Sequence, residues 1–347
     1  MINTGNDNIA RIKRPARRRG VALAAISVLA VAAFVVRSKT RQAERANPPI
    51  GQFIEVDGIR LHYLERGQGQ ALVLLHGNGS MMEDFACSGL LDRAAENYRV
   101  IIFDRPGFGH SERPRNKIWT PIAQARLLQR ALRQLEVEQA IVVGHSWGTL
   151  VALAMALEFP SYVRSLVLLS GYYYPSLRLD AALVAPPAIP VIGDLLRFTV
   201  SPLLGRAIWP AAVRRIFSPA AVSPRFAAFP VWMALRPSQL RAAAAESAMM
   251  VPSAMALCNR YRELTMPVAI LAGAEDRIAD AQHNSKRLHD ELPQSDLRLT
   301  AGAGHMLHYL VPDEVMAAID AVEEAAGLRQ MPAPTRHAGM GRQPSMH

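Results

Sequence analysis

One serine of this chain lies in a glycine-flanked turn where its hydroxyl could act as a nucleophile. The turn has the sequence GHSWG, residues 144–148; it follows the apolar run 140–143 and precedes a helix-like stretch from Thr149. A G-x-S-x-G motif between a strand and a helix holds its serine on a sharp bend, because only small residues fit on either side. The pattern predicts that Ser146 is a catalytic nucleophile.

A serine nucleophile needs a base to accept its proton, and the base needs an acid to orient it. His305 suits the base, since it ends the glycine-containing stretch 302–305 after the apolar run 297–300. Asp276 suits the acid, since it follows the apolar run 268–272. The order Ser, Asp, His is the one expected when all three residues follow strands of an α/β sheet. We therefore predict a triad of Ser146, Asp276 and His305.

Other titratable residues near these positions receive different interpretations. His145 belongs to the turn itself and is expected to be structural. His308 is one helical turn beyond His305 and is expected to pack or to contact substrate. Glu275 and Asp280 flank the predicted acid and are expected to be solvated.

Acyl transfer also requires donors for the oxyanion that develops on the substrate carbonyl. The backbone N–H of Trp147, next to the nucleophile, is one candidate. The loop His76-Gly77-Asn78-Gly79 follows the apolar run 71–75, and its glycines allow the backbone to approach a ligand closely. We predict that Asn78 supplies the second donor.

Apolar residues around these motifs are candidates for the substrate pocket. Trp147, Tyr172 and Met306 are predicted to contact the substrate, each lying close in sequence to a motif or to the start of the cap described below. Further candidates are aromatic residues and methionines of that cap: Tyr172–Tyr174, Trp209, Trp232, Met233, Met249 and Met250. For any single one of these cap residues, packing between cap and sheet is the more common role.

The candidate catalytic residues lie in a chain that alternates regularly between short apolar runs and stretches of helix length. The expected strands are 71–75, 99–103, 140–143, 165–169, 268–272 and 297–300, and the expected helices include 121–135, 149–158 and 312–326. Runs of Val, Ile and Leu without alternation indicate strands buried on both faces of a parallel sheet. The fold class is therefore predicted to be α/β, with a mostly parallel central sheet flanked by helices.

Three features depart from this alternation. Residues 53–65 alternate around Asp57-Gly58, which predicts an opening β-hairpin. The segment from about 172 to 265 is rich in Ala, Pro, Arg and Met, and it is too long and too apolar for a loop. We therefore expect it to form a helical cap, inserted in a domain that spans residues 50–327. Residues 328–347 are expected to be a disordered tail.

The N-terminus carries a basic segment, residues 1–19, followed by an uncharged apolar run, residues 20–36, and an expected linker, residues 37–49. Seventeen apolar residues are at the short end of what spans a bilayer as a helix. An uncleaved membrane anchor is favoured. A cleaved signal with Ala30-Val31-Ala32 as its cleavage site is the alternative, and Arg17-Arg18 also permits twin-arginine export.

The charge distribution bears on orientation and partners. Six Lys/Arg precede the apolar run within residues 11–19, which favours a cytoplasmic N-terminus and an extracytoplasmic position of the α/β domain. The chain has a net charge of +10, but residues 1–45 hold +8 and residues 328–347 hold +3, leaving −1 for the body. Nucleic-acid binding by the body therefore has no electrostatic support. Cys87 and Cys258 are expected to be buried thiols, although a disulfide is also conceivable from the sequence.

Taken together, these motifs resemble the α/β-hydrolase family over about 280 residues. The resemblance includes residues 76–79, the segment DRPGFGHS at 104–111, the Ser146 turn, residues 273–276 and Gly304-His305. Haloalkane dehalogenases and epoxide hydrolases of this family carry aspartate where this chain has Ser146, so those chemistries are disfavoured. Asn78 and Trp147 nevertheless stand in places similar to the halide-binding pair of the dehalogenases.

The resemblance implies a serine hydrolase without metal or organic cofactor. Ester hydrolysis of a moderately apolar substrate, including a lipid met at the membrane, is the favoured activity. C–C bond hydrolysis of ring-cleavage products and haloperoxidase-like perhydrolysis fit the same serine. A non-catalytic binding protein that retains the fold is a third class, because fold does not fix function. The sequence does not specify an oligomeric state.

Overall fold

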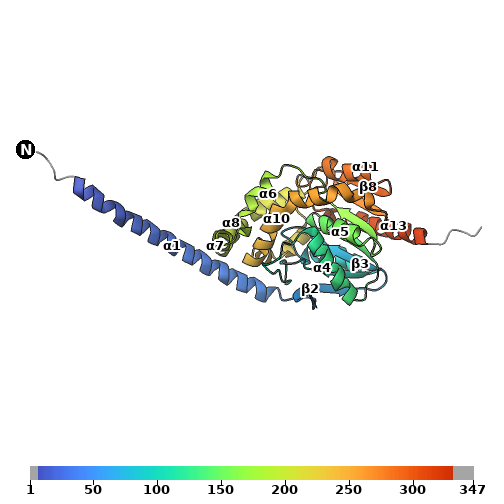
Figure 1. Ribbon diagram of the computed structural model, residues 1–347, viewed down its shortest axis with the longest axis horizontal. Coiled ribbons are helices and arrows are strands. Elements are labelled where there is room, and N and C mark those ends of the chain that lie inside the picture. Colours follow the sequence, from blue (N-terminus) through green and yellow to red (C-terminus); the bar gives the residue numbers. More distant parts are fainter. Residues whose placement is uncertain (1–6, 331–347) are drawn as a thin grey trace, which may run out of the picture.

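A computed structural model describes residues 7–330, with side chains for residues 20–328 other than 179, 180 and 182 (Figure 1). Its centre is an eight-stranded sheet of order β1-β2-β4-β3-β5-β6-β7-β8, in which β2 runs antiparallel to both neighbours and β3 to β8 are parallel. The strands are β1 Gln52–Val56, β2 Ile59–Arg66, β3 Ala71–Leu75, β4 Arg99–Phe103, β5 Ala140–His145, β6 Val163–Leu169, β7 Val268–Gly273 and β8 Ser295–Thr300. The predicted α/β class with a mostly parallel sheet is confirmed.

The parallel strands are buried on both faces, as their unbroken apolar runs predict. Successive side chains of a strand point to opposite faces, so Leu72 and Leu74 of β3 belong to one hydrophobic cluster, whereas Val73 and Leu75 belong to another. The first cluster is covered by α2, α3 and α13, and the second by α4 and α5. These helices span Glu83–Ser88, Leu90–Ala94, Pro312–Gln330, Pro121–Gln134 and Trp147–Glu158, respectively.

A helical cap is inserted between β6 and β7, where the alternation of strands and helices stops. Its helices lie on one side of the sheet domain (Figure 1). They are α6 Leu179–Val184, η1 Pro186–Ala188, α7 Ile192–Phe198, α8 Val200–Phe217, η2 Pro224–Ala228, α9 Val231–Ala234, α10 Pro237–Leu257 and η3 Cys258–Glu263. After β7, the chain forms η4 Gln282–Lys286 and α11 Arg287–Glu291, and α12 Leu307–Leu310 follows β8. Cys87 and Cys258 are free thiols.

The N-terminal region forms one long helix, α1 Asp7–Ala46, that projects from the domain (Figure 1). Within the described residues, its portion from Gly20 is long and apolar enough to cross a membrane, by length and composition alone. The expected linker differs from the structure, because residues 37–46 continue the helix. The segment RSKTRQAERA contains no Gly or Pro and consists mostly of good helix formers, and the helix ends just before Pro48-Pro49. At the other terminus, α13 reaches Gln330, so most of the expected tail lies outside the described residues.

One buried ion pair joins the cap to the sheet domain. Arg105 follows β4, and its two terminal nitrogens donate to the Glu246 carboxylate of α10 at 2.5 and 3.0 Å. Both side chains have no solvent exposure. Arg105 also donates to the carbonyl oxygens of His76 and Gly77, at 2.8 and 3.0 Å. A single guanidinium thus holds the loop after β3 and the cap in a fixed relation.

Removing one partner of this pair should destabilise the protein strongly, because an unpaired charge would stay buried. We expect Glu246→Ala to lower the free energy of unfolding by about 3–5 kcal/mol. The control is Asp92→Ala, which breaks the exposed Arg66–Asp92 pair and should cost about 1 kcal/mol or less. Urea unfolding of the full chain in detergent, followed by circular dichroism, measures both. Equal losses for the two variants would contradict the role given to Arg105.

Candidate active site

Ser146 lies between β5 and α5 in a backbone conformation that few residues adopt. Its φ and ψ are 52° and −120°, a strained combination for a residue with a side chain. The flanking glycines make the turn possible. A Cβ on Gly144 would lie 2.7 Å from the Gly148 carbonyl oxygen, and one on Gly148 would lie 2.1 Å from the Leu75 carbonyl oxygen. The turn therefore requires the glycines that the motif supplies, and it places Ser146 at the start of a helix, where backbone N–H groups lack helical partners.

Asp276 and His305, which are 29 residues apart in sequence, are in contact. His305 Nδ1 lies 2.7 Å from Asp276 Oδ2, and both side chains are buried. The other carboxylate oxygen of Asp276 accepts the N–H groups of Ile278 and Ala279, at 2.7 and 3.1 Å. The carboxylate is thereby fixed in orientation, and it in turn fixes the imidazole ring.

Two glycines allow the loops that carry the acid and the base to approach each other. A Cβ on Gly273, at the end of β7, would lie 2.3 Å from the carbonyl oxygens of Ala303 and Gly304. A Cβ on Gly304 would lie 2.2 Å from the carbonyl oxygen of Ser218 in the cap. The glycines beside both predicted residues are thus required by backbone packing.

The loop after β3 is held by hydrogen bonds that fix its carbonyl groups. The His76 ring is fully buried, and burial lowers its pKa to about 3, so the ring is neutral. Its Nδ1 donates to the Gly77 carbonyl at 2.8 Å, and its Nε2 accepts the Arg105 N–H at 3.0 Å. Next in the loop, the Asn78 amide donates to the Ala243 carbonyl and to Ser247 Oγ of α10, at 3.1 and 3.0 Å. Because the side-chain N–H groups of Asn78 donate to the cap, its backbone N–H is the donor that remains for a ligand.

A cavity of about 460 Å³ lies between the cap and the ends of the parallel strands. Ser146 and His305 line it together with the loop residues Gly77 and Asn78. The rest of its wall is mainly apolar and comes largely from the cap: Ala181, Val184, Trp209, Ala212, Val213, Ile216, Phe226, Phe229 and Met250. The cap residues on this wall, apart from Trp209 and Met250, have no sequence motif that could have identified them.

The structure brings some of the predicted pocket residues to this cavity and not others. Met306 lines it, as predicted. The side chain of Trp147 packs in the hydrophobic core beneath the turn, 1% exposed, because α5 points it back toward the sheet. Tyr172 is buried nearby and its hydroxyl accepts the Ser176 N–H at 2.8 Å. Neither side chain lines this cavity, although Tyr172 lines a neighbouring pocket together with Asp276. Tyr173, Tyr174 and Met233 are buried in packing.

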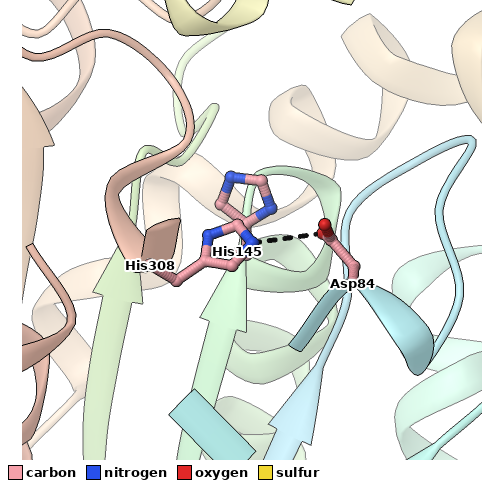
Figure 2. A group of neighbouring side chains, drawn as sticks. All are labelled: Asp84, His145 and His308. Carbon is pink, nitrogen blue, oxygen red and sulfur yellow. Dashed lines mark ion pairs between the residues drawn. The ribbon is translucent and has the colours of Figure 1, made fainter. Parts of the chain in front are cut away.

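Three buried polar side chains that the sequence did not link meet at the cavity, and two of them, Asp84 and His145, contribute to its wall. Figure 2 shows Asp84 of α2, His145 at the end of β5 and His308 of α12 converging. His308 Nε2 lies 3.3 Å from Asp84 Oδ2. His145 Nε2 lies 3.0 Å from the backbone oxygen of His305, so this group supports the segment that carries the predicted base. Asp84 has no sequence motif around it, and only the tertiary structure identifies it.

The electrostatics of the group follow from its burial. Burial by itself would raise the pKa of Asp84, but the interactions with His308, His145 and Tyr309 together outweigh it and lower that pKa to about 2. Burial lowers the pKa of His145 well below its usual value, so its ring is neutral. The possible ligand atoms of the three residues lie within 4.8 Å of one another, and two histidines with a carboxylate are ligand types that zinc accepts. Because the Asp84–His308 ion pair already engages two of them, we interpret the group as an ion pair beside a neutral histidine.

The lowered pKa of Asp84 predicts a pH-dependent contribution to stability. A carboxyl whose pKa is depressed in the folded state stabilises the protein above its unfolded pKa, and the contribution is lost as pH falls through the folded value. We expect Asp84→Asn to cost about 2 kcal/mol at pH 6–7 and about half of that at pH 3. Urea unfolding at several pH values measures this, with the exposed Asp92→Asn as control. A cost for Asp84→Asn that does not change with pH would contradict the ion pair.

The chain is similar in sequence to known proteins of one family. The family described as alpha/beta hydrolase fold matches residues 70–312. An uncharacterized protein of Mycobacterium tuberculosis is 28% identical over 293 residues, which cover 80% of this chain and 81% of that protein. A 2-hydroxymuconate semialdehyde hydrolase of Pseudomonas sp. is 37% identical over 136 residues, 38% of this chain and 48% of that enzyme.

Solved structures share the fold of this chain. A bacterial membrane phospholipase A, described as a virulence factor, superposes with a TM-score of 0.62 at 22% identity, and the match covers 92% of this chain and all of that chain. At this identity the likeness concerns the fold. With the family match over residues 70–312, the sheet order and the Ser146 turn, the conclusion is plain: this chain belongs to the alpha/beta hydrolase fold family.

Proposed function

We propose that this protein is a serine hydrolase that cleaves carboxylic esters of moderately apolar substrates. The observation that carries the proposal is the arrangement of Ser146 on its strained turn and of His305, held by Asp276 at 2.7 Å, on the wall of one mainly apolar cavity. Membership of the hydrolase family is shown independently. The choice of an ester as substrate is the proposal.

In the proposed mechanism, Asp276 orients His305, and His305 accepts the Ser146 proton through Nε2 as the hydroxyl oxygen attacks the ester carbonyl carbon. The backbone N–H groups of Trp147 and Asn78 donate to the tetrahedral oxyanion. His305 then protonates the leaving alcohol, and an acyl-enzyme remains on Ser146. A water molecule deprotonated by His305 hydrolyses this intermediate, so the acid is released and Ser146 regains its proton.

We further propose that α1 anchors the protein in a membrane, with the hydrolase domain on the extracytoplasmic side. The apolar length of the helix and the basic residues before it support this placement. The phospholipase to which the fold is similar is described as a membrane protein. A membrane lipid ester is consistent with both the anchor and the apolar cavity wall.

Replacing the nucleophile tests the mechanism directly. We expect the full chain in detergent to hydrolyse a series of p-nitrophenyl esters, and Ser146→Ala to lower kcat by about 10⁴-fold or more, because the covalent step is lost. The matched control is Ser165→Ala in β6, where the buried Oγ has no hydrogen-bond partner among the described residues. This control should leave the activity unchanged. An activity that survives in Ser146→Ala would exclude Ser146 as the nucleophile.

C–C bond hydrolysis is the second candidate, because the relative at 37% identity is a 2-hydroxymuconate semialdehyde hydrolase. The same serine turn would serve it. Turnover of a 2-hydroxy-6-oxo-2,4-dienoate, with no turnover of any ester in the series, would favour this candidate over the esterase. Turnover of neither substrate by the folded protein would favour a non-catalytic binding protein.

The role of Asn78 can be tested separately, since its side chain and its backbone have different partners. We expect Asn78→Ala to lower kcat by less than about tenfold, because alanine retains the backbone N–H and only the contacts to α10 are lost. Loss of a true side-chain oxyanion donor costs about 10²–10³-fold. The measurement is kcat on the preferred p-nitrophenyl ester. A loss of that larger size would show that the Asn78 amide, not its backbone, stabilises the oxyanion.

A further inference from the structure

The outer surface of the cap carries an unusual concentration of exposed apolar side chains. Among the residues whose side chains are described, 23 large apolar side chains are exposed, and 11 of them lie between Leu177 and Ile208. Six more belong to the apolar part of α1, so only six are found elsewhere. The cap group consists of Leu177, Leu183, Val184, Ile189, Val191, Ile192, Leu195, Phe198, Val200, Leu204 and Ile208. Apolar patches of this kind mark surfaces that are covered by a partner or a membrane.

This apolar cap surface lies beside the proposed anchor. Helix α1 packs against α7, α8 and α9, and Figure 1 shows α7 and α8 next to α1. Val36, the last residue of the apolar run, is 1% exposed, and Ala43 is buried among cap residues. Farther along, Glu44 forms an ion pair with Arg236 of the cap at 3.2 Å. The cap is therefore fixed to the C-terminal part of the anchor and cannot lie far from the bilayer surface.

The short length of the apolar run in α1 brings the apolar cap surface close to the hydrocarbon core of the bilayer. The uncharged run of residues 20–36 would span about 25 Å as a helix, which is less than the roughly 30 Å of a hydrocarbon core. Val36, at the end of this run, is already buried in the structure. The short span thus draws the cap toward the lipid, where amphipathic helices bury an apolar face about 5–10 Å deep.

The charges around the surface suit the same partner. Residues 177–208 contain three arginines, two aspartates, and neither lysine nor glutamate. Asp194 pairs with Arg197 and also with Arg115, at 3.0 Å in the latter case, so much of this charge is neutralised within the protein. On α1, Arg37, Lys39, Arg41 and Arg45 follow the apolar run. Cations directly after the apolar run would lie at the membrane surface, where they can bind anionic headgroups, and the apolar side chains of the cap can contact the acyl chains.

From these observations we propose that the outer face of α6, η1, α7 and the first half of α8 docks into the lipid bilayer beside α1. Two of these helices also contribute to the cavity wall, α6 through Ala181 and Val184 and α8 through Trp209, Ala212 and Val213. Val184 belongs to both the exposed group and the cavity wall, so the two surfaces meet at α6. An acyl chain leaving the bilayer at this face has only the thickness of the cap helices to cross before it reaches Ser146. The docking rests on the proposed anchor, and its use for substrate delivery rests on the proposed esterase activity.

Spin labels on the full chain in vesicles of phosphatidylcholine and phosphatidylglycerol test the docking. In a background with Cys87→Ala and Cys258→Ala, single labels are placed at Leu195→Cys in α7, at Ile26→Cys in the anchor and at Asp290→Cys in α11, which lies far from α7 in Figure 1. We expect the labels at 195 and 26 to be more accessible to oxygen than to a water-soluble nickel complex. The label at 290 should show the opposite preference.

The other outcomes separate the docking from the anchor. Lipid contact at 26 with water contact at 195 would overturn the docking and leave the anchor intact. Water contact at both positions would overturn the anchor and the docking together. A label at 195 that is inaccessible to both reagents would show that a second copy of the chain, not lipid, covers this face.

Substrate delivery is tested with variants outside the cavity. We expect Leu195→Glu combined with Leu204→Glu to lower hydrolysis of a vesicle-embedded long-chain ester by about tenfold or more, with unchanged hydrolysis of soluble p-nitrophenyl butyrate. The matched control combines Leu299→Glu and Leu328→Glu, which alter exposed leucines outside the cap. Equal rates of all variants on vesicles would overturn delivery through the cap. If no ester is hydrolysed at all, the esterase proposal fails while the spin-label result still decides the docking.

Discussion

The candidate site depends above all on the Arg105 guanidinium. It has no exposed surface, and it contacts three parts of the chain that are distant in sequence: the carbonyl groups after β3, Gln124 of α4 and Glu246 of the cap. A buried charge is tolerated only when its hydrogen-bonding groups are satisfied, so these partners must be present together in the folded state. The consequence is that the loop carrying Asn78, helix α4 and the cap that closes the cavity keep one geometry.

The site itself is assembled from loops at the carboxyl ends of β3, β5, β7 and β8. This is where α/β sheets place their ligands, because adjacent parallel strands end at the same edge and their loops diverge above it. Close backbone contacts, rather than side-chain bulk, bring the loops together. Gly144, Gly148, Gly273 and Gly304 each lie where a Cβ would collide with a carbonyl oxygen or another backbone atom. The buried group of Asp84, His145 and His308 lies at the same edge, and His145 contacts the backbone oxygen of His305 (Figure 2).

The cap combines two surfaces with different functions. Its inner side supplies most of the apolar wall of the cavity, and its outer side carries the exposed apolar residues next to α1. A soluble enzyme would have little reason to keep Leu, Ile and Val exposed on both α7 and α8, since such patches favour association. The packing of α1 against α7 and α8 places the proposed anchor beside a helix, α8, that contributes to the cavity wall.

The amino-acid sequence by itself determined the fold class, the β-hairpin and the strands, and it singled out Ser146, Asp276 and His305 as the candidate triad. Those predictions depend on local signals, namely apolar runs, glycines beside turns and the order of three residues along the chain. Other features were decided only by the tertiary structure. Trp147 and Tyr172 are aromatic and close to the site in sequence, but side-chain direction, set by α5 and by the turn after β6, buries them away from the cavity. Asp84 pairs with His308 and Glu246 pairs with Arg105, and in each pair the two residues are more than a hundred residues apart in sequence. No local sequence pattern predicts such pairs. The helix over residues 37–46 has local signals, namely good helix formers without Gly or Pro, but only the tertiary structure shows that its residue Ala43 packs against cap side chains.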